Sequence, residues 1–234
     1  MAKTVVLDPG HGGRDPGASQ YGLQEKDLNL ALALEVAERL DGMEALLTRD
    51  CDIYLSLADR VEFSREVAPD LFLSLHVNAG GGHGFESFIY SGLQAGNPVE
   101  AMQEALHEEI MAMLSRRQIV DRGMKEAAFY VLKYNLCPAV LIESLFLDNE
   151  REARLWKDPA FVGELAGGVA AGIRAALAAA GDSSEAAPVI GPDTTLYTVQ
   201  VGAFIGYDNA RQRLAEAREA GFKDAFIYRK QNWR

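Results

Sequence analysis

Short apolar runs alternate along this chain with stretches of helical periodicity, and this alternation restricts the possible folds more than any other feature. Val5-Val6-Leu7 and Val140-Leu141-Ile142 are continuous apolar runs, which is typical of strands buried on both faces. Strands are predicted at 4–8, 45–48, 71–77, 86–91, 130–133 and 139–144, and helices at 26–40, 57–67, 98–115 and 159–180. The sequence therefore predicts an α/β fold, with a mostly parallel sheet covered by helices on both faces.

A segment rich in small residues, proline and glycine interrupts this pattern at 182–193, and it predicts a linker. The residues before it, 1–181, are expected to form one domain. After it, 194–234 contains a strand pattern, a helix pattern at 209–220 and a second strand pattern, which together predict one small βαβ unit. Such a unit alone has little core and is expected to be only marginally stable.

The net charge of −11 argues against general nucleic-acid binding. Residues 194–234 carry a net +3 against −14 for the rest, which is either a surface bias without function or a tail suited to anionic wall polymers. The apolar-leaning stretch at 161–181 contains Glu164, Arg174 and several glycines, so it predicts a packed helix rather than a membrane span. Cys51 and Cys137 are expected to be buried free thiols.

The first motif with chemical content is Asp8-Pro-Gly-His-Gly-Gly-Arg-Asp-Pro-Gly17, directly after a predicted strand. A phosphate-binding loop is the obvious alternative, but the Gly-Lys-Ser/Thr ending is missing and the glycines do not have dinucleotide spacing. Glycines around His11 instead allow a sharp turn that leaves the imidazole projecting into a cleft. A lone histidine is often structural, and the flanking glycines favour a functional role for His11.

Two further residues could join His11. His76 lies at the end of the buried run at 71–77, before a glycine-rich loop, and is either a ligand or a core histidine. Glu25 lies at the start of a predicted helix, where the helix dipole favours a carboxylate in any case, and Asp27 competes with it. His83 could line the same cleft, whereas His107, in a charged helix, is expected to be solvated.

Glu143 ends an apolar run, and a carboxylate there is costly to bury without a partner. Two histidines, one carboxylate and an open position are a common ligand set for catalytic zinc, and a further carboxylate can handle protons around a zinc-bound water. All four positions lie where ligands bind in open α/β sheets, at strand ends or in the loops that follow.

Four segments closely resemble the zinc-dependent N-acetylmuramoyl-L-alanine amidases of bacterial autolysins, sporulation lytic enzymes and phage endolysins. They are Asp8-Pro-Gly-His-Gly-Gly, Glu25-Lys-Asp-Leu-Asn-Leu, Ser74-Leu-His-Val-Asn-Ala and Val140-Leu-Ile-Glu-Ser-Leu-Phe-Leu-Asp-Asn149. The resemblance covers roughly residues 3–180 and implies a twisted, mostly parallel six-stranded sheet with helices on both faces. It also implies cleavage of the amide bond between N-acetylmuramic acid and L-alanine of the stem peptide in bacterial peptidoglycan.

By the same resemblance, His11, Glu25 and His76 ligate one catalytic Zn²⁺, and Glu143 is the catalytic glutamate that moves protons. The family motif selects Glu25 over Asp27. One departure is Leu145, which stands where the family usually has glycine, two residues after the catalytic glutamate. We expect Leu145 to change the local shape of the cleft rather than the mechanism.

The segment Tyr197-Thr-Val-Gln-Val-Gly-Ala-Phe204 and the following helix pattern resemble half of a SPOR domain, a peptidoglycan-binding module with two βαβ halves. The single half either pairs with a second copy of the chain or reflects a shortened chain, and the oligomeric state stays open. No nucleic-acid or membrane partner is expected. Met1-Ala-Lys3 leads directly into the first strand, so no signal peptide is expected. We therefore expect synthesis in the cytoplasm and action on the cell wall after lysis or by another route.

Two other readings remain at this stage. A zinc carboxypeptidase of related architecture would place histidine and glutamate within a three-residue step, whereas His11 and Glu25 are fourteen residues apart. A non-enzymatic wall-binding protein with a decayed site is disfavoured because all four polar positions are present. The sequence does not separate an endolysin from a sporulation enzyme or an autolysin, and it does not identify the target species.

Overall fold

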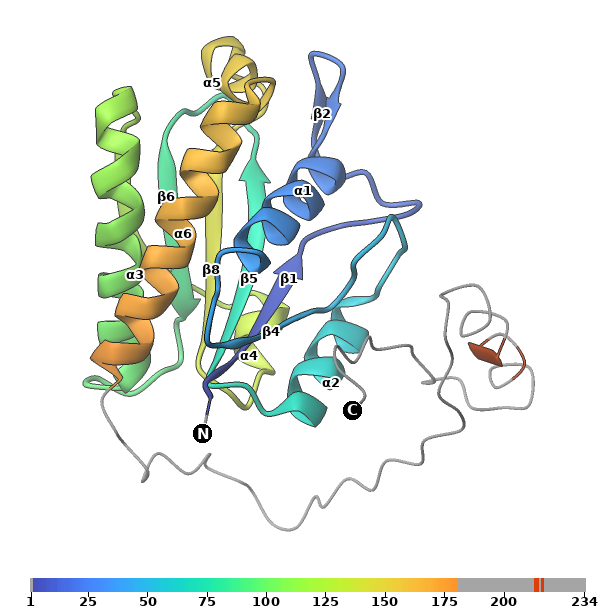
Figure 1. Cartoon of the computed structure of the whole chain (residues 1–234), viewed down its shortest axis with the longest axis vertical. Helices are drawn as coiled ribbons and strands as arrows, with labels where there is room; N and C mark the ends of the chain where they lie inside the picture. The colour runs from blue at the N-terminus through green and yellow to red at the C-terminus, as the bar shows by residue number, and fades with distance from the viewer. Residues whose placement is uncertain (1, 181–212, 215, 217–234) are drawn as a thin grey trace. The chain divides into compact units, whose positions relative to one another are not determined.

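Figure 1 shows a computed structural model in which helices pack on both faces of one six-stranded sheet. The structure describes residues 2–180, 213, 214 and 216. The strands follow the order β4-β1-β5-β8-β6-β7, with bounds Glu44–Leu47, Thr4–Pro9, Leu71–Asn78, Ala139–Phe146, Phe85–Tyr90 and Asp121–Ala127. All neighbours are parallel except β8 and β6. The prediction of a mostly parallel six-stranded sheet is therefore confirmed.

Helices cover the two faces unequally. Three long helices, α1 (Glu25–Ala37), α3 (Pro98–Leu114) and α6 (Pro159–Ala179), pack together over one face (Figure 1). The opposite face contacts α2 (Leu57–Val67) and the short helix α4 (Tyr130–Lys133). A short antiparallel pair, β2 (Ser19–Gln20) and β3 (Leu23–Gln24), precedes α1. The remaining helices are η1 (Ser115–Arg117) and α5 (Glu150–Trp156).

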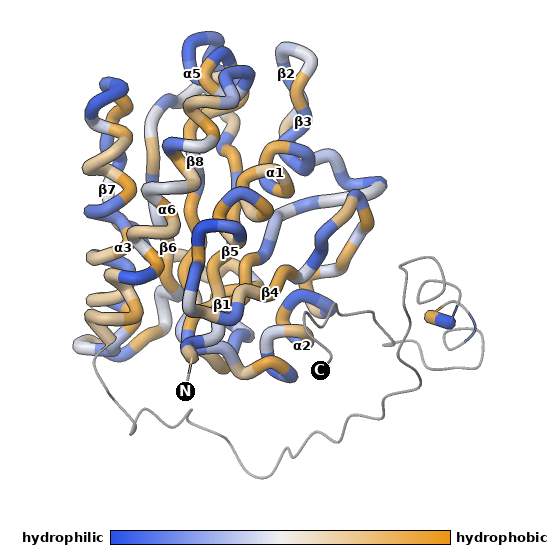
Figure 2. Tube along the Cα trace, in the orientation of Figure 1, coloured by the Kyte–Doolittle hydropathy of each residue, from blue (hydrophilic) through white to orange (hydrophobic). Residues whose placement is uncertain are grey.

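The core lies between the sheet and the three long helices. Hydrophobic residues run along β1, β5 and β8 in Figure 2, and Val5, Leu73, Val140 and Ile142 are all fully buried there. By length and composition α6 could cross a membrane, but half of that stretch is buried within the protein. At Gly172 an added Cβ would lie 2.9 Å from the carbonyl oxygen of Leu106 in α3, so the two helices touch closely. The prediction that this stretch is a packed helix is confirmed.

The predicted strand at 130–133 is wrong, because these residues form α4. Phe129, the N-cap of α4, has an extended backbone, and its carbonyl accepts hydrogen bonds from the backbone N–H groups of Leu132 (3.1 Å) and Lys133 (2.8 Å). The apolar pair Val131 and Leu132 is buried as a helical turn, which apolarity alone does not distinguish from a strand. The sixth strand is β7, an edge strand that is polar, contains a glycine and alternates between exposed and half-buried residues.

The expectation that His107 is solvated is also wrong. His107 is 4% exposed, because α3 presents an inward stripe that contains Met102, Leu106 and Ile110 as well. Its Nδ1 lies 2.8 Å from Ser87 Oγ in β6, and its Nε2 lies 2.9 Å from Asp121 Oδ1 in β7. The histidine therefore joins α3 to the edge of the sheet.

The predicted linker at 182–193 and most of the unit at 194–234 lie outside the described residues. Arg213, Leu214 and Glu216 are helical, within the range where a helix is predicted.

Candidate metal centre

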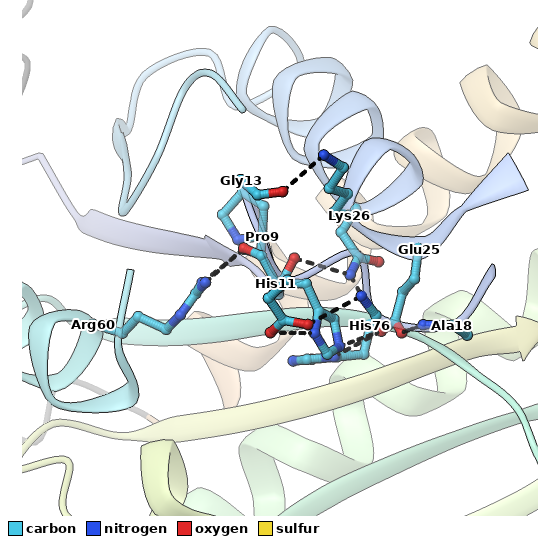
Figure 3. A network of polar contacts seen from close by, with 12 residues as sticks. Pro9, His11, Gly13, Ala18, Glu25, Lys26, Arg60 and His76 are labelled. Carbon is cyan, nitrogen blue, oxygen red and sulfur yellow. Dashed lines mark hydrogen bonds and ion pairs between the residues drawn. The ribbon is translucent and has the colours of Figure 1, made fainter. Parts of the chain in front are cut away.

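Three side chains with metal-ligand chemistry meet at the carboxyl end of the parallel strands. His11 follows β1, Glu25 is the first residue of α1, and His76 lies near the end of β5. His11 Nε2 lies 3.1 Å and His76 Nδ1 lies 2.9 Å from Oε1 of Glu25, and Figure 3 shows the three groups converging. One ligand atom from each residue lies within 4.8 Å of the others. The competing carboxylate, Asp27, is exposed and outside this group.

Two glycines make room for these ligands. A Cβ on Gly10 would lie 2.2 Å from Cε1 of His76, and a Cβ on Gly17 would lie 2.5 Å from Oε2 of Glu25 and 2.7 Å from Cδ2 of His11. His11 itself has a φ of +60°, a left-handed conformation that is uncommon for a residue with a side chain. The glycines of the first motif therefore serve the close packing of the ligand side chains as well as the turn.

Glu25 is held from several directions. Its Oε2 accepts a hydrogen bond from the backbone N–H of Ala18 (2.9 Å), and its Oε1 accepts one from Val77 (3.2 Å). Burial raises the pKa of Glu25, but the contacts with His11 and His76 outweigh burial and hold the pKa well below its usual range. The carboxylate is therefore ionised and fixed in place.

Asp15 orients the imidazole of His11, and sequence reasoning did not single it out. Oδ2 of Asp15 lies 2.9 Å from Nδ1 of His11, which directs Nε2 toward Glu25. Burial lowers the pKa of His11, but Glu25 and Asp15 outweigh this effect and raise it. Asp15 lies four residues after His11 in the same motif, and this proximity is the feature of the sequence that could have indicated the contact.

Glu143 lies beside this group in the sheet. In the parallel pairing of β5 and β8, Glu143 is directly opposite His76, and both side chains line the same cavity as His11. Within the described part of the chain, Oε2 of Glu143 is buried and has no hydrogen-bond partner. Burial is the main cause that raises the pKa of Glu143 to about 7. The carboxyl group is therefore poised to exchange a proton near neutral pH.

A second carboxylate, Glu86, faces Glu143 across the antiparallel pairing of β8 and β6. Glu86 is 4% exposed and accepts hydrogen bonds from Arg122 Nε (2.8 Å), Asn78 Nδ2 (2.6 Å) and Lys125 Nζ. Burial raises the pKa of Glu86, but the bonds from Lys125 and Arg122 outweigh it and lower the pKa. Sequence reasoning missed Glu86, although the alternation of its strand places it on the face of Glu143.

The cavity beside the ligands has a volume of about 240 Å³. Its rim includes apolar side chains that are exposed by about two fifths or more: Tyr54, Leu57, Phe129 and Tyr130. The side chains of His11 and His76 are 26% and 20% exposed, so the ligand group is accessible from one side. A polar centre with an apolar rim suits a substrate that has both polar and apolar parts.

The donor set fits zinc. Two ligand atoms bound tetrahedrally to one zinc ion at about 2.0–2.1 Å lie about 3.3 Å apart. The distances of 3.1 Å and 2.9 Å from Glu25 Oε1 to the two imidazole nitrogens are close to this value. A divalent cation would also be a suitable neighbour for the unpartnered Oε2 of Glu143.

Leu145 has a φ of +68°, which explains why a glycine suits this position. Between the pairs His76–Glu143 and Asn78–Phe146 the two strands fall out of register, because β8 contains one residue more than β5 there. This bulge turns Leu145 into the core, where it is fully buried. Leu145 does not itself line the cavity, and its expected effect on the shape of the cleft stays a prediction.

The other candidates lie outside the ligand group. His83 is exposed and does not line the cavity. In the described residues Cys51 and Cys137 form no disulfide, and both are only partly buried rather than buried as expected.

Comparison with known proteins places these features in a family. Residues 5–175 match the family model described as N-acetylmuramoyl-L-alanine amidase, and residues 169–229 match the SPOR domain. The second match overlaps the end of α6, so it begins before the predicted boundary at residue 194.

Individual relatives agree with this assignment. The chain is 39% identical to the N-acetylmuramoyl-L-alanine amidase CwlM of Bacillus licheniformis over 229 residues, covering 96% of this chain and 85% of the relative. It is 41% identical to the endolysin of Bacillus phage SPP1, covering 74% of this chain and 65% of the relative. The crystal structure of an N-acetylmuramoyl-L-alanine amidase from Clostridium difficile 630 superposes with a TM-score of 0.71 at 30% identity, covering 76% of this chain and 97% of that one.

Proposed function

The chain belongs to the N-acetylmuramoyl-L-alanine amidase family, and from this premise we propose how its residues carry out the reaction. The protein is a peptidoglycan hydrolase that cleaves the amide bond between N-acetylmuramic acid and L-alanine of the stem peptide. We propose that it does so as a zinc enzyme, with His11, Glu25 and His76 as the ligands and Glu143 as the catalytic residue. The convergence of these three ligand side chains beside Glu143 is the observation that carries the proposal.

When bound, zinc would acidify a water ligand to a pKa of about 7 and polarise the scissile carbonyl. Glu25 would supply the one negative charge among the ligands, and its bonds from Ala18 and Val77 keep that charge in position. Asp15 would keep the imidazole of His11 in the orientation that presents Nε2. These contacts reduce the reorganisation that the ligands need during the reaction.

Glu143 would take a proton from the attacking water at its unpartnered Oε2 and give it to the nitrogen of the leaving L-alanine. In the metal-free protein burial raises the pKa of Glu143 to about 7, so the carboxyl group holds a proton more readily than an exposed glutamate would. Glu86, fixed by Arg122 and Lys125, would place a second negative charge beside it and keep the proton affinity of Glu143 high. The apolar rim of the cavity would limit the access of bulk water.

The C-terminal part of the chain matches a peptidoglycan-binding domain, and we propose that residues 194–234 help to hold the enzyme on the cell wall. The net positive charge of this part suits anionic wall polymers. We further propose that a single βαβ half gains affinity by pairing with a second copy of the chain.

The test of the catalytic assignment is the Glu143→Ala variant. It should bind zinc and sedimented cell walls, but digestion should release no new N-terminal L-alanine. Glu66→Ala is a matched control, because the pKa of Glu66 is also raised to about 7 while Glu66 does not line the cavity. Amine release by Glu143→Ala close to that of the control would refute the role of Glu143.

Removal of the metal tests the zinc assignment separately. Treatment with a chelator should abolish amine release, and added Zn²⁺ should restore it. Full activity after treatment, with metal content shown to be zero, would remove zinc from the mechanism. Mass spectrometry of the products also distinguishes this reaction from that of a carboxypeptidase, which would release a free C-terminal amino acid.

A further inference from the structure

Arg49 lies behind the metal-ligand loop and bonds main-chain oxygens on three separate segments. Its Nε donates to Pro9 O (2.9 Å), its Nη1 donates to Cys51 O (3.2 Å), and its Nη2 donates to Gly10 O (2.9 Å) and Lys26 O (2.8 Å). Arg49 is 2% exposed and is the largest of the fully buried side chains in the described residues. Every hydrogen bond that the structure gives its guanidinium ends on a carbonyl oxygen.

The carbonyls bound by Nη2 adjoin two of the proposed ligands. Gly10 immediately precedes His11, and Lys26 immediately follows Glu25. A single nitrogen therefore ties the loop after β1 to the first turn of α1. Together with the bonds from Lys26 Nζ to Gly13 O (3.0 Å) and from Asn29 Nδ2 to Gly10 O (3.3 Å), this atom holds the two segments at a fixed separation.

A second arginine completes the support of the loop. Arg60, 3% exposed, donates from Nη1 to Pro9 O (2.7 Å) and from Nη2 to His11 O (2.7 Å), as Figure 3 shows for Pro9. Three successive carbonyls, of Pro9, Gly10 and His11, thus point into two guanidinium groups. These bonds help to hold His11 in its left-handed conformation, which a residue with a side chain rarely adopts.

Burial of the charged Arg49 side chain in this position costs free energy. Burial and the nearby Arg60 lower the pKa of Arg49 to about 10, so the guanidinium remains charged at neutral pH. The buried carboxylate nearby, Asp8, is bonded to Arg60 Nη1 (2.7 Å), Thr48 Oγ1 (2.7 Å) and Ser74 Oγ (2.8 Å) rather than to Arg49. A buried cation without a direct carboxylate partner contributes poorly to stability. The role of Arg49 therefore follows from its several N–H donors, which a planar guanidinium holds in fixed directions.

We propose that Arg49 is a positioning residue that fixes His11 and Glu25 at the separation needed to bind the metal. This inference rests on the proposed zinc site. Lysine cannot replace Arg49, because one ammonium group does not reach carbonyls on three segments in the directions of a planar fork.

The experiment compares Arg49→Lys with the unsubstituted full-length protein. Arg151→Lys is the matched control, because Arg151 also donates to carbonyls, those of Gln118 (3.2 Å) and Arg117 (2.7 Å), but is exposed and does not line the cavity. His11→Ala defines the signal that is lost when a ligand is removed. Zn²⁺ affinity is measured by competition with a chromogenic chelator, the geometry by the visible bands of bound Co²⁺, and folding by near-ultraviolet circular dichroism.

Arg49→Lys should remain folded, bind Zn²⁺ about 10- to 100-fold more weakly and give altered Co²⁺ bands, while Arg151→Lys should match the unsubstituted protein. Affinity and bands within error of the control would overturn the inference. Loss of the native dichroism spectrum would also overturn it, because Arg49 would then serve the stability of the domain. Failure of the unsubstituted protein to bind Zn²⁺ would instead refute the proposed zinc site.

Discussion

Replacement of Glu143 by glutamine should make the metal-free protein gain stability relative to the unsubstituted protein as the pH rises toward 7, while abolishing its activity. The pKa of Glu143 rises from 4.5 to about 7 in the folded state, chiefly through burial. One pKa unit corresponds to about 1.4 kcal/mol, so keeping the ionised carboxylate in the fold costs about 3 kcal/mol at high pH. This is a sizeable part of the 5–15 kcal/mol that typically separates folded from unfolded domains.

Proton binding determines whether the stability of the protein rises or falls with pH. The folded-state pKa of Glu143 lies above the unfolded-state value, so the folded protein holds more protons between pH 4.5 and pH 7. Its stability therefore decreases as the pH rises through this window, and the decrease ends above pH 7. Glutamine does not ionise, so the stability of Glu143→Gln relative to the unsubstituted protein should increase over the same window.

Urea unfolding of chelator-treated protein between pH 4.5 and pH 8.5 measures this difference. An amide without partners adds a cost that does not depend on pH, so the quantity to compare is the change with pH rather than the absolute stability. Glu66→Gln is the control, and its change should be smaller because Glu66 is more exposed to solvent screening. A stability difference between Glu143→Gln and the unsubstituted protein that stays flat from pH 4.5 to pH 8.5 would show that burial of Glu143 is not costly.

Three further substitutions test the packing around the site. Gly17→Ala should weaken Zn²⁺ binding at least tenfold, because the added Cβ would collide with Glu25 and His11. Gly22→Ala is the control, since Gly22 has a similar positive φ but open space around it, and equal Zn²⁺ affinities of the two variants would contradict this packing. Leu145→Gly should lower the free energy of unfolding by about 2–3 kcal/mol, because the lost buried side chain outweighs the relieved backbone strain, and a more stable variant in urea unfolding would reverse that balance. His107→Ala should destabilise the fold by about 2–4 kcal/mol with unchanged Zn²⁺ affinity, and loss of affinity would connect this buried histidine to the metal centre.

The middle of the sheet, one candidate ligand and the candidate catalytic residue could be predicted from local patterns. Continuous apolar runs identified β1, β5 and β8, and a polar residue near the end of such a run drew attention to His76 and Glu143. The edge strand β7 was missed because half of its surface faces solvent, so its sequence lacks an apolar run. The helix α4 was mistaken for a strand because a single helical turn is too short to show a period.

Glu25, Arg49 and Glu86 show what local patterns do not contain. Glu25 looks like an ordinary residue of a first helical turn, and only the family motif singled it out. Its contacts with His76 and Val77 join residues about fifty positions apart. Arg49 contacts Pro9 and Gly10 across about forty positions, and Glu86 acquires its neighbours through strand pairing. Such partners follow from the topology, so no window of sequence reveals them.

The shared carboxylate oxygen of Glu25 has a consequence for metal exchange. Oε1 of Glu25 contacts both imidazoles by itself, while Asp15, Ala18 and Val77 hold the surrounding atoms. The three candidate ligands therefore stay assembled through protein contacts alone, unlike those of small zinc domains, which unfold when the ion is withdrawn. Stripping and reloading this enzyme with different divalent ions should thus be a matter of simple equilibration, with no refolding step between one metal form and the next.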